Sequence, residues 1–261
     1  MNVLSDGFDI EGFWKKLTVA DRRVLLLDYD GTLAPFRKRR DQAVPYKGVR
    51  EILEGIMNSG VCRLVIVSGR WTEDLKPLLG IKKLPEVWGS HGIERLRPDG
   101  SREIAAFSKS ALKGIADADD WVEHMGLHHM MEQKPGCIAL HWRGMDREKI
   151  KELKRMVKKD WSKIAERAGL DILEFDGGVE LRVPGHDKGK AVETILAEEG
   201  DAAVAYLGDD VTDEDAFRAV KGKGMGVLVR KELRKTSADV WIKPPEELMK
   251  FLKKWTMICG V

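Results

Sequence analysis

The stretch LLLDYDGTLAPF, residues 25–36, runs an apolar segment straight into two aspartates. Residues 24–28 are too few for a helix and apolar enough for a buried strand. Asp28 and Asp30 end that strand, and the chain then turns at Gly31. Two carboxylates this close together need a cation or a shared proton. A turn built on Asp-Gly chemistry explains the pair equally well, so the pair alone favours neither reading.

Strands and helices alternate through the first and last thirds of the chain, which predicts βαβ units and a mostly parallel sheet. Thr72 is the expected N-cap of one helix. The expected strands are residues 24–28, 63–67, 86–89, 204–207 and 226–229, and the expected helices are residues 48–57, 72–79, 188–198, 214–220 and 245–255.

The middle of the chain has a different pattern, helix–strand–strand twice over (αββαββ). The expected helices are 107–125 and 150–168, and the expected strands are 128–133, 137–142, 171–175 and 179–183. We therefore predict an α/β core over residues 1–106 and 184–261, with an inserted α+β domain over residues 107–183.

Composition limits the classes of function. The 261 residues carry a formal net charge of +2, with 43% hydrophobic residues, so neither an acidic nor a basic partner is indicated. Basic residues on the helix at 150–168 lack interleaved aromatics and predict a solvated face rather than a nucleic-acid site. No run approaches the roughly 20 apolar residues of a membrane span. Three scattered cysteines and no signal-peptide pattern lead us to expect a cytoplasmic protein. We also expect a monomer.

Further polar residues follow other strands, where ligands bind in open parallel sheets. Ser68 ends the strand at 63–67, and Asp209 and Asp210 follow the strand at 204–207. Lys188 begins a helix, where a basic side chain opposes the helix dipole unless it neutralises nearby acids or phosphate. Mg²⁺, a hard cation with oxygen ligands, would relieve the repulsion among the carboxylates.

Acidic residues also open the helix after residue 210. Thr212 and Asp215 have the spacing of a capping pair, and acids in a first turn favour the helix dipole. Glu214 and Asp215 are therefore expected to be structural, whereas Asp213 comes too early for that explanation alone.

Four motifs occur in a fixed order: DYDGT (28–32), SGR (68–70), DKG (187–189) and GDD-x-TD (208–213). Together they resemble the haloacid dehalogenase superfamily of aspartate-based phosphotransferases. The segments VSGRWTEDL, GSHGIE, VELRVPGHDKGKA and YLGDDVTDEDAF, with EQK and HWR in the insert, resemble the trehalose-6-phosphate phosphatases. Trp142 departs from the tyrosine common in that family but keeps an aromatic ring. The resemblance implies a Rossmann-like core with a cap domain, and a Mg²⁺-dependent hydrolase.

The resemblance also implies roles for the core residues. Asp28 would be the nucleophile that forms an aspartyl phosphate, and Asp30 would be the general acid and base. Ser68 and Lys188 would hold the phosphoryl oxygens, near Gly31 and Arg70. The implied Mg²⁺ ligands are Asp28, the backbone carbonyl of Asp30, and Asp209. Asp210 and Asp213 would either support these ligands or bind the ion as alternates.

In the insert, the resemblance implies that Glu132, Lys134 and Glu180 bind sugar hydroxyls, with Arg143 as a further contact. An ion pair across neighbouring strands is the plainer explanation of the first three. His91 and Glu94 are held only as residues lining the site.

Three hypotheses about the function follow. The first is hydrolysis of trehalose 6-phosphate to trehalose and phosphate, with a trehalose-phosphate synthase as a candidate partner. The second is a phosphatase of another sugar phosphate, such as sucrose 6-phosphate or a glycosyl-phosphoglycerate, which only cap residues would discriminate. The third is a non-catalytic module that senses sugar phosphate beside a synthase, which the presence of both aspartates disfavours.

Overall fold

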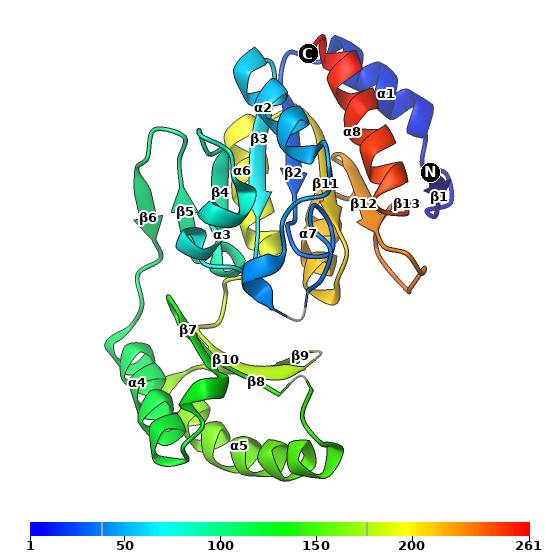
Figure 1. Ribbon diagram of the computed structural model, residues 1–261. Helices are drawn as coiled ribbons and strands as arrows, with labels where there is room; N and C mark the ends of the chain where they lie inside the picture. Colours follow the sequence, from blue (N-terminus) through cyan, green and yellow to red (C-terminus); the bar gives the residue numbers. More distant parts are fainter. Residues whose placement is uncertain (38, 143, 176) are drawn as a thin grey trace. The chain divides into compact units, whose positions relative to one another are not determined.

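The computed structural model describes residues 1–37, 39–142, 144–175 and 177–261. It divides the chain into two units, one of residues 1–103 and 187–261 and the other of residues 104–186. A mostly parallel sheet lies in the first unit and a small antiparallel sheet in the second (Figure 1). The predicted fold class, an α/β core with an inserted αββαββ unit, is confirmed.

The large sheet has nine strands in the order β1-β13-β12-β11-β2-β3-β4-β5-β6. The strands from β13 to β4 run parallel, while β1 and β5 pair antiparallel with β13 and β4. The strands are β1 Asn2–Val3, β2 Arg23–Leu27, β3 Arg63–Val67, β4 Glu86–Gly89, β5 Glu94–Leu96, β6 Arg102–Ile104, β11 Ala203–Gly208, β12 Met225–Val229 and β13 Val240–Ile242.

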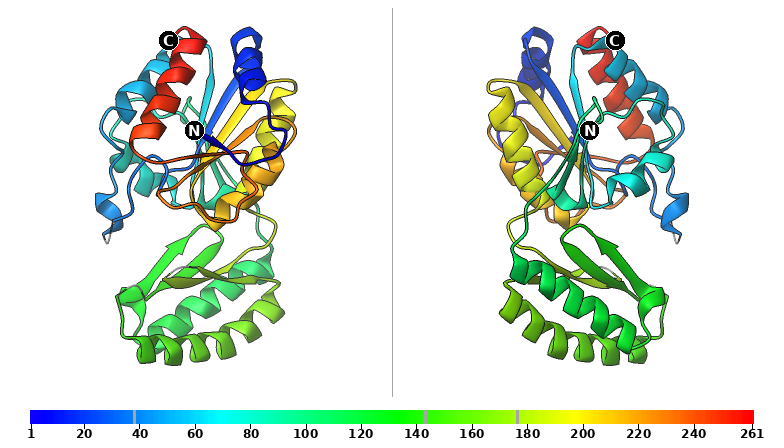
Figure 2. Two further views of the ribbon diagram at one scale, coloured as in Figure 1. Left: turned by 90° about the vertical axis from the view of Figure 1, so that its right-hand side faces the viewer. Right: turned by 90° about the vertical axis from the view of Figure 1, so that its left-hand side faces the viewer.

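Helices cover both faces of this sheet, which is why β2 reads as a continuous apolar run. Leu25 and Leu27 pack on one side, and Val24 and Leu26 on the other. Helices α2 and α8 lie opposite α6 and α7 (Figure 2). The first face holds α1 Ile10–Val19, α2 Val49–Ser59, α3 Thr72–Leu79 and α8 Glu246–Cys259, and the second holds α6 Lys188–Glu199 and α7 Glu214–Val220.

Strand order reverses between β2 and β11. The chain goes from β2 to β3 and β4 on one side, and later from β11 to β12 and β13 on the other. Such a switch point leaves a crevice outside the carboxyl ends of the two strands, where ligands bind in α/β folds. Single 3₁₀ turns lie at η1 Arg40–Gln42, η2 Ser90–Gly92 and η4 Val211–Asp213.

The second unit packs two helices on one face of a sheet with the order β7-β8-β10-β9. Ile138 and Leu140 point to the helices and share one buried cluster with Trp161, so the unit has a core of its own. Ala139, between them, points to the opposite face. The elements are α4 Lys109–His124, η3 His128–Met130, β7 Met131–Lys134, β8 Cys137–His141, α5 Arg147–Ala168, β9 Asp171–Phe175 and β10 Gly178–Arg182.

Two helix starts differ from the prediction. Thr72 is not an N-cap: Trp71 precedes α3 without a side-chain cap, and Thr72 instead hydrogen-bonds to buried Glu94. The capping box before α7 joins Asp210 to Asp213, not Thr212 to Asp215. At the first start, a tertiary partner takes the Thr72 hydroxyl, and at the second, a capping box with the same three-residue spacing forms two residues earlier. Over the described residues, no helix is both long and apolar enough to cross a bilayer.

Candidate active site

The carboxyl ends of three neighbouring strands position the core residues of the site. Leu27 of β2 pairs with Ile66 of β3 on one side and with Leu207 of β11 on the other. The next residue, Asp28, still donates its N–H to the carbonyl of Leu207, at 2.8 Å. Ser68 and Asp209 directly follow β3 and β11, so all three side chains come from one edge of the sheet.

Lys188 joins two of the acidic residues. Its Nζ lies 2.6 Å from Oδ1 of Asp28 and 2.7 Å from Oδ1 of Asp213. Lys188 is the first residue of α6, whose N-cap Asp187 accepts the N–H of Lys190. The lysine at a helix start is thus explained by the buried carboxylates that it contacts.

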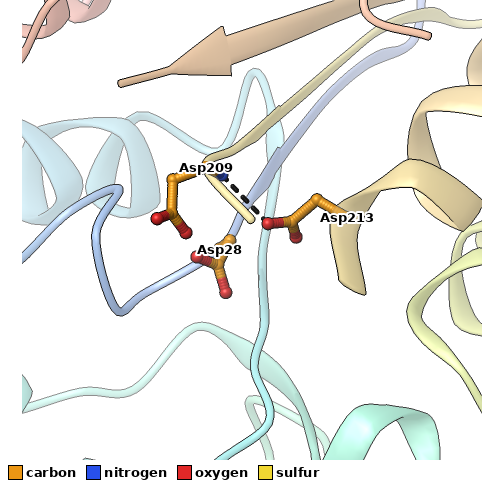
Figure 3. A group of neighbouring side chains, drawn as sticks. All are labelled: Asp28, Asp209 and Asp213. Carbon is orange, nitrogen blue, oxygen red and sulfur yellow. Dashed lines mark hydrogen bonds between the residues drawn. The ribbon is translucent and has the colours of Figure 1, made fainter. Parts of the chain in front are cut away.

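Three carboxylates form one buried group (Figure 3). Oxygens of Asp28, Asp209 and Asp213 lie within 4.8 Å of one another. Asp213 fixes the loop after β11, because its Oδ2 accepts the N–H groups of Asp209 and Asp210, each at 2.9 Å. Its Oδ1 also accepts the hydroxyl of Tyr206 at 2.6 Å. The group comes from the two strands that flank the switch point.

Burial and mutual repulsion make Asp28 and Asp209 hard to ionise without a cation. Burial raises the pKa of Asp28 to about 7, Lys188 opposes this, and Asp213 adds to it. Burial and the charges of Asp28 and Asp213 raise the pKa of Asp209 well above its ordinary value. Burial lowers the pKa of Lys188, but Asp213 and Asp28 outweigh it, and the pKa lies above its usual range.

The donor set fits a hard divalent cation such as Mg²⁺. Carboxylate oxygens are the ligands that Mg²⁺ prefers, and two to three of them converge here. Among the described residues, the side chains of Asp30 and Asp210 fall outside this group of carboxylates. Asp210 instead caps η4 with its side chain.

Asp30 is held by Arg70 rather than by the buried group. Nε and Nη2 of Arg70 donate to the two carboxylate oxygens of Asp30, at 2.6 and 2.7 Å. Arg70 is itself buried, and its N–H donates to Oγ of Ser68 at 3.1 Å. The SGR segment therefore lies beside Asp30. Gly31 lies against Asp209, since a Cβ at this position would come 2.2 Å from Oδ2 of that carboxylate.

The insert brings its three predicted residues to one face of its sheet. Glu132 and Glu180 both pair with Ala139, so they share the face that α4 and α5 do not cover. Nζ of Lys134 lies 3.8 Å from Oε1 of Glu132 and 3.7 Å from Oε2 of Glu180. Nε2 of His141 lies 2.7 Å from the other oxygen of Glu132. Arg143 is outside the described residues.

The sequence analysis did not predict two polar contacts of the site. The Thr32 hydroxyl donates to Oδ2 of Asp28 at 3.1 Å, and the Tyr206 hydroxyl reaches Asp213. Thr32 stands inside the DYDGT motif, so its position offered a signal. Tyr206 reads as one more apolar strand residue and offered none. Of the candidate lining residues, Glu94 is buried against Thr72, and the ring of His91 packs against Gly69.

Solved structures share this fold. The C-terminal domain of a C. albicans trehalose-6-phosphate phosphatase matches with a TM-score of 0.75 and 20% identity, covering 100% of both chains. A haloacid dehalogenase-like hydrolase from Bacteroides thetaiotaomicron matches with a TM-score of 0.66 and 15% identity, over 89% of this chain and 99% of that one. The fold is therefore that of the haloacid dehalogenase-like proteins.

The sequence narrows this class to one family. The sequence model of the trehalose-phosphatase family matches residues 26–243. A probable trehalose-phosphate phosphatase of Arabidopsis thaliana is 32% identical over 259 residues, covering 88% of this chain and 71% of that protein. The chain belongs to the trehalose-phosphatase family, as the motifs predicted.

One relative is much longer than this chain. An uncharacterised glycosyl hydrolase of Mycobacterium tuberculosis is 31% identical over 272 residues, covering 97% of this chain. The chain spans only 20% of that relative's length.

Proposed function

We propose that this protein is a Mg²⁺-dependent phosphatase that hydrolyses trehalose 6-phosphate to trehalose and phosphate. The observation that carries the proposal is the contact of Lys188 with both Asp28 and Asp213, beside Asp209 at the switch point of the sheet. Membership of the trehalose-phosphatase family supports the substrate.

Asp28 is the proposed nucleophile. Its carboxylate attacks phosphorus, the bond from phosphorus to the sugar oxygen breaks, and an aspartyl phosphate forms. Asp30 gives a proton to the departing sugar oxygen and then takes one from the water that hydrolyses the intermediate. Lys188 stabilises negative charge on the phosphoryl oxygens, with Ser68, Gly31 and Arg70 as further contacts of the phosphoryl group.

Asp28 and Asp209 would hold Mg²⁺, together with the backbone carbonyl of Asp30. Asp213 and Asp210 would support them, the first through the backbone contacts described above. When bound, the ion offsets the charge of the acids and orients the phosphoryl oxygens.

The proposed sugar site is the face of the insert's sheet that α4 and α5 do not cover. Lys134 lies in ion-pair range of both Glu132 and Glu180, and charged groups are strong partners for hydroxyls in a closed site. Arg143 is a further proposed contact. Residues 107–183 would then act as the cap that recognises the sugar.

A phosphate-release assay tests the reaction. The panel is trehalose 6-phosphate, sucrose 6-phosphate, a glucosyl-phosphoglycerate and p-nitrophenyl phosphate, each with Mg²⁺ and with EDTA. We expect turnover of trehalose 6-phosphate above the others, loss in EDTA, and no turnover by Asp28→Asn. Faster turnover of another sugar phosphate would identify that compound, and not trehalose 6-phosphate, as the substrate. Phosphate release by a folded Asp28→Asn would overturn the nucleophile, and no release from any compound would favour a sensing module.

A matched pair of variants tests the sugar site. We expect Glu180→Ala to lower kcat/KM for trehalose 6-phosphate far more than for p-nitrophenyl phosphate. Glu174→Ala makes the same change on β9, where Glu174 pairs with Lys154 of α5, and it should affect neither substrate. If Glu180→Ala lowered kcat/KM equally for both substrates, a role of Glu180 in sugar binding would be contradicted.

The remaining proposals concern setting and assembly. The buried free thiols of Cys62, Cys137 and Cys259 fit a reducing compartment, which supports a cytoplasmic protein. A monomer is expected, with a trehalose-phosphate synthase as a candidate partner. Light scattering of the chain alone and mixed with a synthase tests both statements.

A further inference from the structure

The segment 230–239, between β12 and β13, sends two arginines back to the end of β11. Nε of Arg234 donates to the carbonyl of Asp209 at 3.3 Å, and its Nη2 donates to the carbonyl of Asp210 at 2.6 Å. Arg230 also donates to the carbonyl of Asp209, at 3.3 Å. Neither arginine belongs to the motifs that carry the chemistry.

Arg234 is held in place by Glu214. The two side chains are 19% and 14% exposed, and Nη1 of Arg234 lies 2.5 Å from Oε1 of Glu214. Glu214 also accepts the Thr236 hydroxyl at 2.8 Å and the N–H of Ser237 at 2.7 Å. The guanidinium is therefore anchored on the first turn of α7 and on its own loop, which fixes its direction.

The two peptide units after β11 are thus held from both ends. Oδ2 of Asp213 accepts the N–H groups of Asp209 and Asp210, while Arg234 donates to the carbonyls of the same two residues. Asp213 is buried in the group of carboxylates, but Arg234 reaches only the backbone of the loop. Arg234 can therefore affect the carboxylate of Asp209 through backbone geometry.

We propose that Arg234, anchored by Glu214, is a positioning residue that sets the affinity for the divalent cation. The inference rests on the metal site of the proposed function. With Arg234 in place, the Asp209 carboxylate stays beside Asp28 and Asp213. Without it, the loop keeps its contacts with Asp213 and Arg230 but loses those with Arg234. The competent arrangement then becomes a smaller fraction of the population, and the apparent dissociation constant rises by the inverse of that fraction.

Metal binding to the full chain, without substrate, tests the proposal. Mg²⁺ is titrated by calorimetry and Mn²⁺ by electron paramagnetic resonance. We expect Arg234→Met to raise the dissociation constant by about tenfold, the low end for residues that orient a metal ligand. Arg234→Lys keeps the charge but loses the planar guanidinium that donates to two carbonyls at once, so it should restore only part of the affinity. Glu214→Gln should weaken binding by less than Arg234→Met.

Arg218→Met is the matched control. Arg218 lies on α7, is 58% exposed and pairs with Asp215, so this variant loses a charge nearby without touching the loop. Its dissociation constant should equal that of the unmodified chain, and circular dichroism and the metal-free Tm establish which variants fold. If Arg234→Met does not fold, Glu214→Gln decides.

The outcomes separate the two proposals. An unchanged dissociation constant in a folded Arg234→Met, or in Glu214→Gln where that variant decides, would overturn the positioning role while leaving the phosphatase proposal intact. An unmodified chain that binds neither Mg²⁺ nor Mn²⁺ would overturn the metal-dependent function and this inference with it.

Discussion

Two glycines let carboxylates approach bare backbone in the site. Gly31 has a φ of +83°, and a Cβ there would meet Oδ2 of Asp209 at 2.2 Å. At Gly208, a Cβ would come 2.4 Å from Cγ of Asp213. Both positions need glycine because a carboxylate occupies the space that a side chain would take, and Gly31 needs it also for its left-handed backbone.

Gly31→Ala should therefore harm metal binding as well as stability. The left-handed backbone alone costs about 1–2 kcal/mol for alanine. The methyl group would also displace Asp209, so we expect weaker Mg²⁺ binding by calorimetry. Gly100→Ala is the control, since Gly100 has a φ of +88° with nothing within 4 Å. Equal metal affinities in the two variants would contradict the importance of the close approach.

Asp28 gives the metal-free protein a distinctive pH dependence. Its folded pKa of about 7 lies above the value of about 3.9 in an unfolded chain. The folded state then binds the proton more tightly, so this contribution to stability is present below the unfolded pKa and is lost as the pH rises through 7. Asp209 acts in the same direction.

We therefore expect the free energy of unfolding in EDTA to contain a component that falls between about pH 4 and pH 7. Denaturant titrations of the unmodified chain and of Asp28→Asn isolate that component, because the variant should lose much of the fall. Mg²⁺ should raise Tm more at pH 8 than at pH 5, since ionised acids bind it. A difference between the two proteins that does not vary with pH would contradict the raised pKa.

At the scale of elements, the start of α6 combines capping with chemistry. Asp187 accepts the N–H of Lys190 at 2.8 Å, which orients the turn that begins with Lys188. Asp9 makes the same kind of contact at the start of α1, with the N–H of Gly12 at 2.8 Å. Only the first cap lies next to the proposed site.

Asp187→Ala and Asp9→Ala make the same chemical change at these two caps. Each should lower the free energy of unfolding by about 1 kcal/mol. Only Asp187→Ala should also lower kcat for trehalose 6-phosphate, because it loosens the turn that carries Lys188. Asp187→Asn should restore much of both properties. Equal kcat values in Asp187→Ala and Asp9→Ala would contradict a role of the Asp187 cap in catalysis.

The sequence predicted those elements that local patterns determine. The alternation of strands and helices, together with the motifs, predicted the strand ends at Asp28, Ser68 and Asp209. It also predicted the helix start at Lys188, and the structure has all four at these positions. The capping role predicted for Thr72 was wrong because its hydroxyl donates to Glu94, which is close only in the fold. The one predicted for Thr212 was wrong because residues 210 and 213 offer the same three-residue spacing as residues 212 and 215. The contacts of Tyr206 and Arg234 have no local signature, since each reaches a residue in another segment.

At the scale of the whole molecule, the two units have separate cores. Trp161 of α5 is fully buried among residues of the insert, and Trp255 of α8 is fully buried in the other unit. The sequence predicts an inserted domain over residues 107–183 from the change of pattern. It did not predict the pairing of β1 with β13, because a two-residue strand has no recognisable period.

Trp161→Ala should destabilise residues 104–186 selectively. Removing a buried tryptophan costs about 3–5 kcal/mol. Hydrogen exchange followed by mass spectrometry should show faster exchange in the insert, with protection in residues 1–103 and 187–261 little changed. Trp255→Ala should give the reverse pattern. Equal loss of protection across both units in either variant would indicate a single cooperative structure.

The central strand pair has a consequence for how the chain folds. β2 ends at Leu27 and β11 begins at Ala203, so the pairing that brings Asp28 to Asp209 closes a very long loop, and contacts of this kind slow folding. The ends of the insert meet, with the rings of Phe107 and His186 at 6.3 Å. An insert that folds early on its own core therefore acts as a short link, which reduces the entropy lost when β11 joins β2.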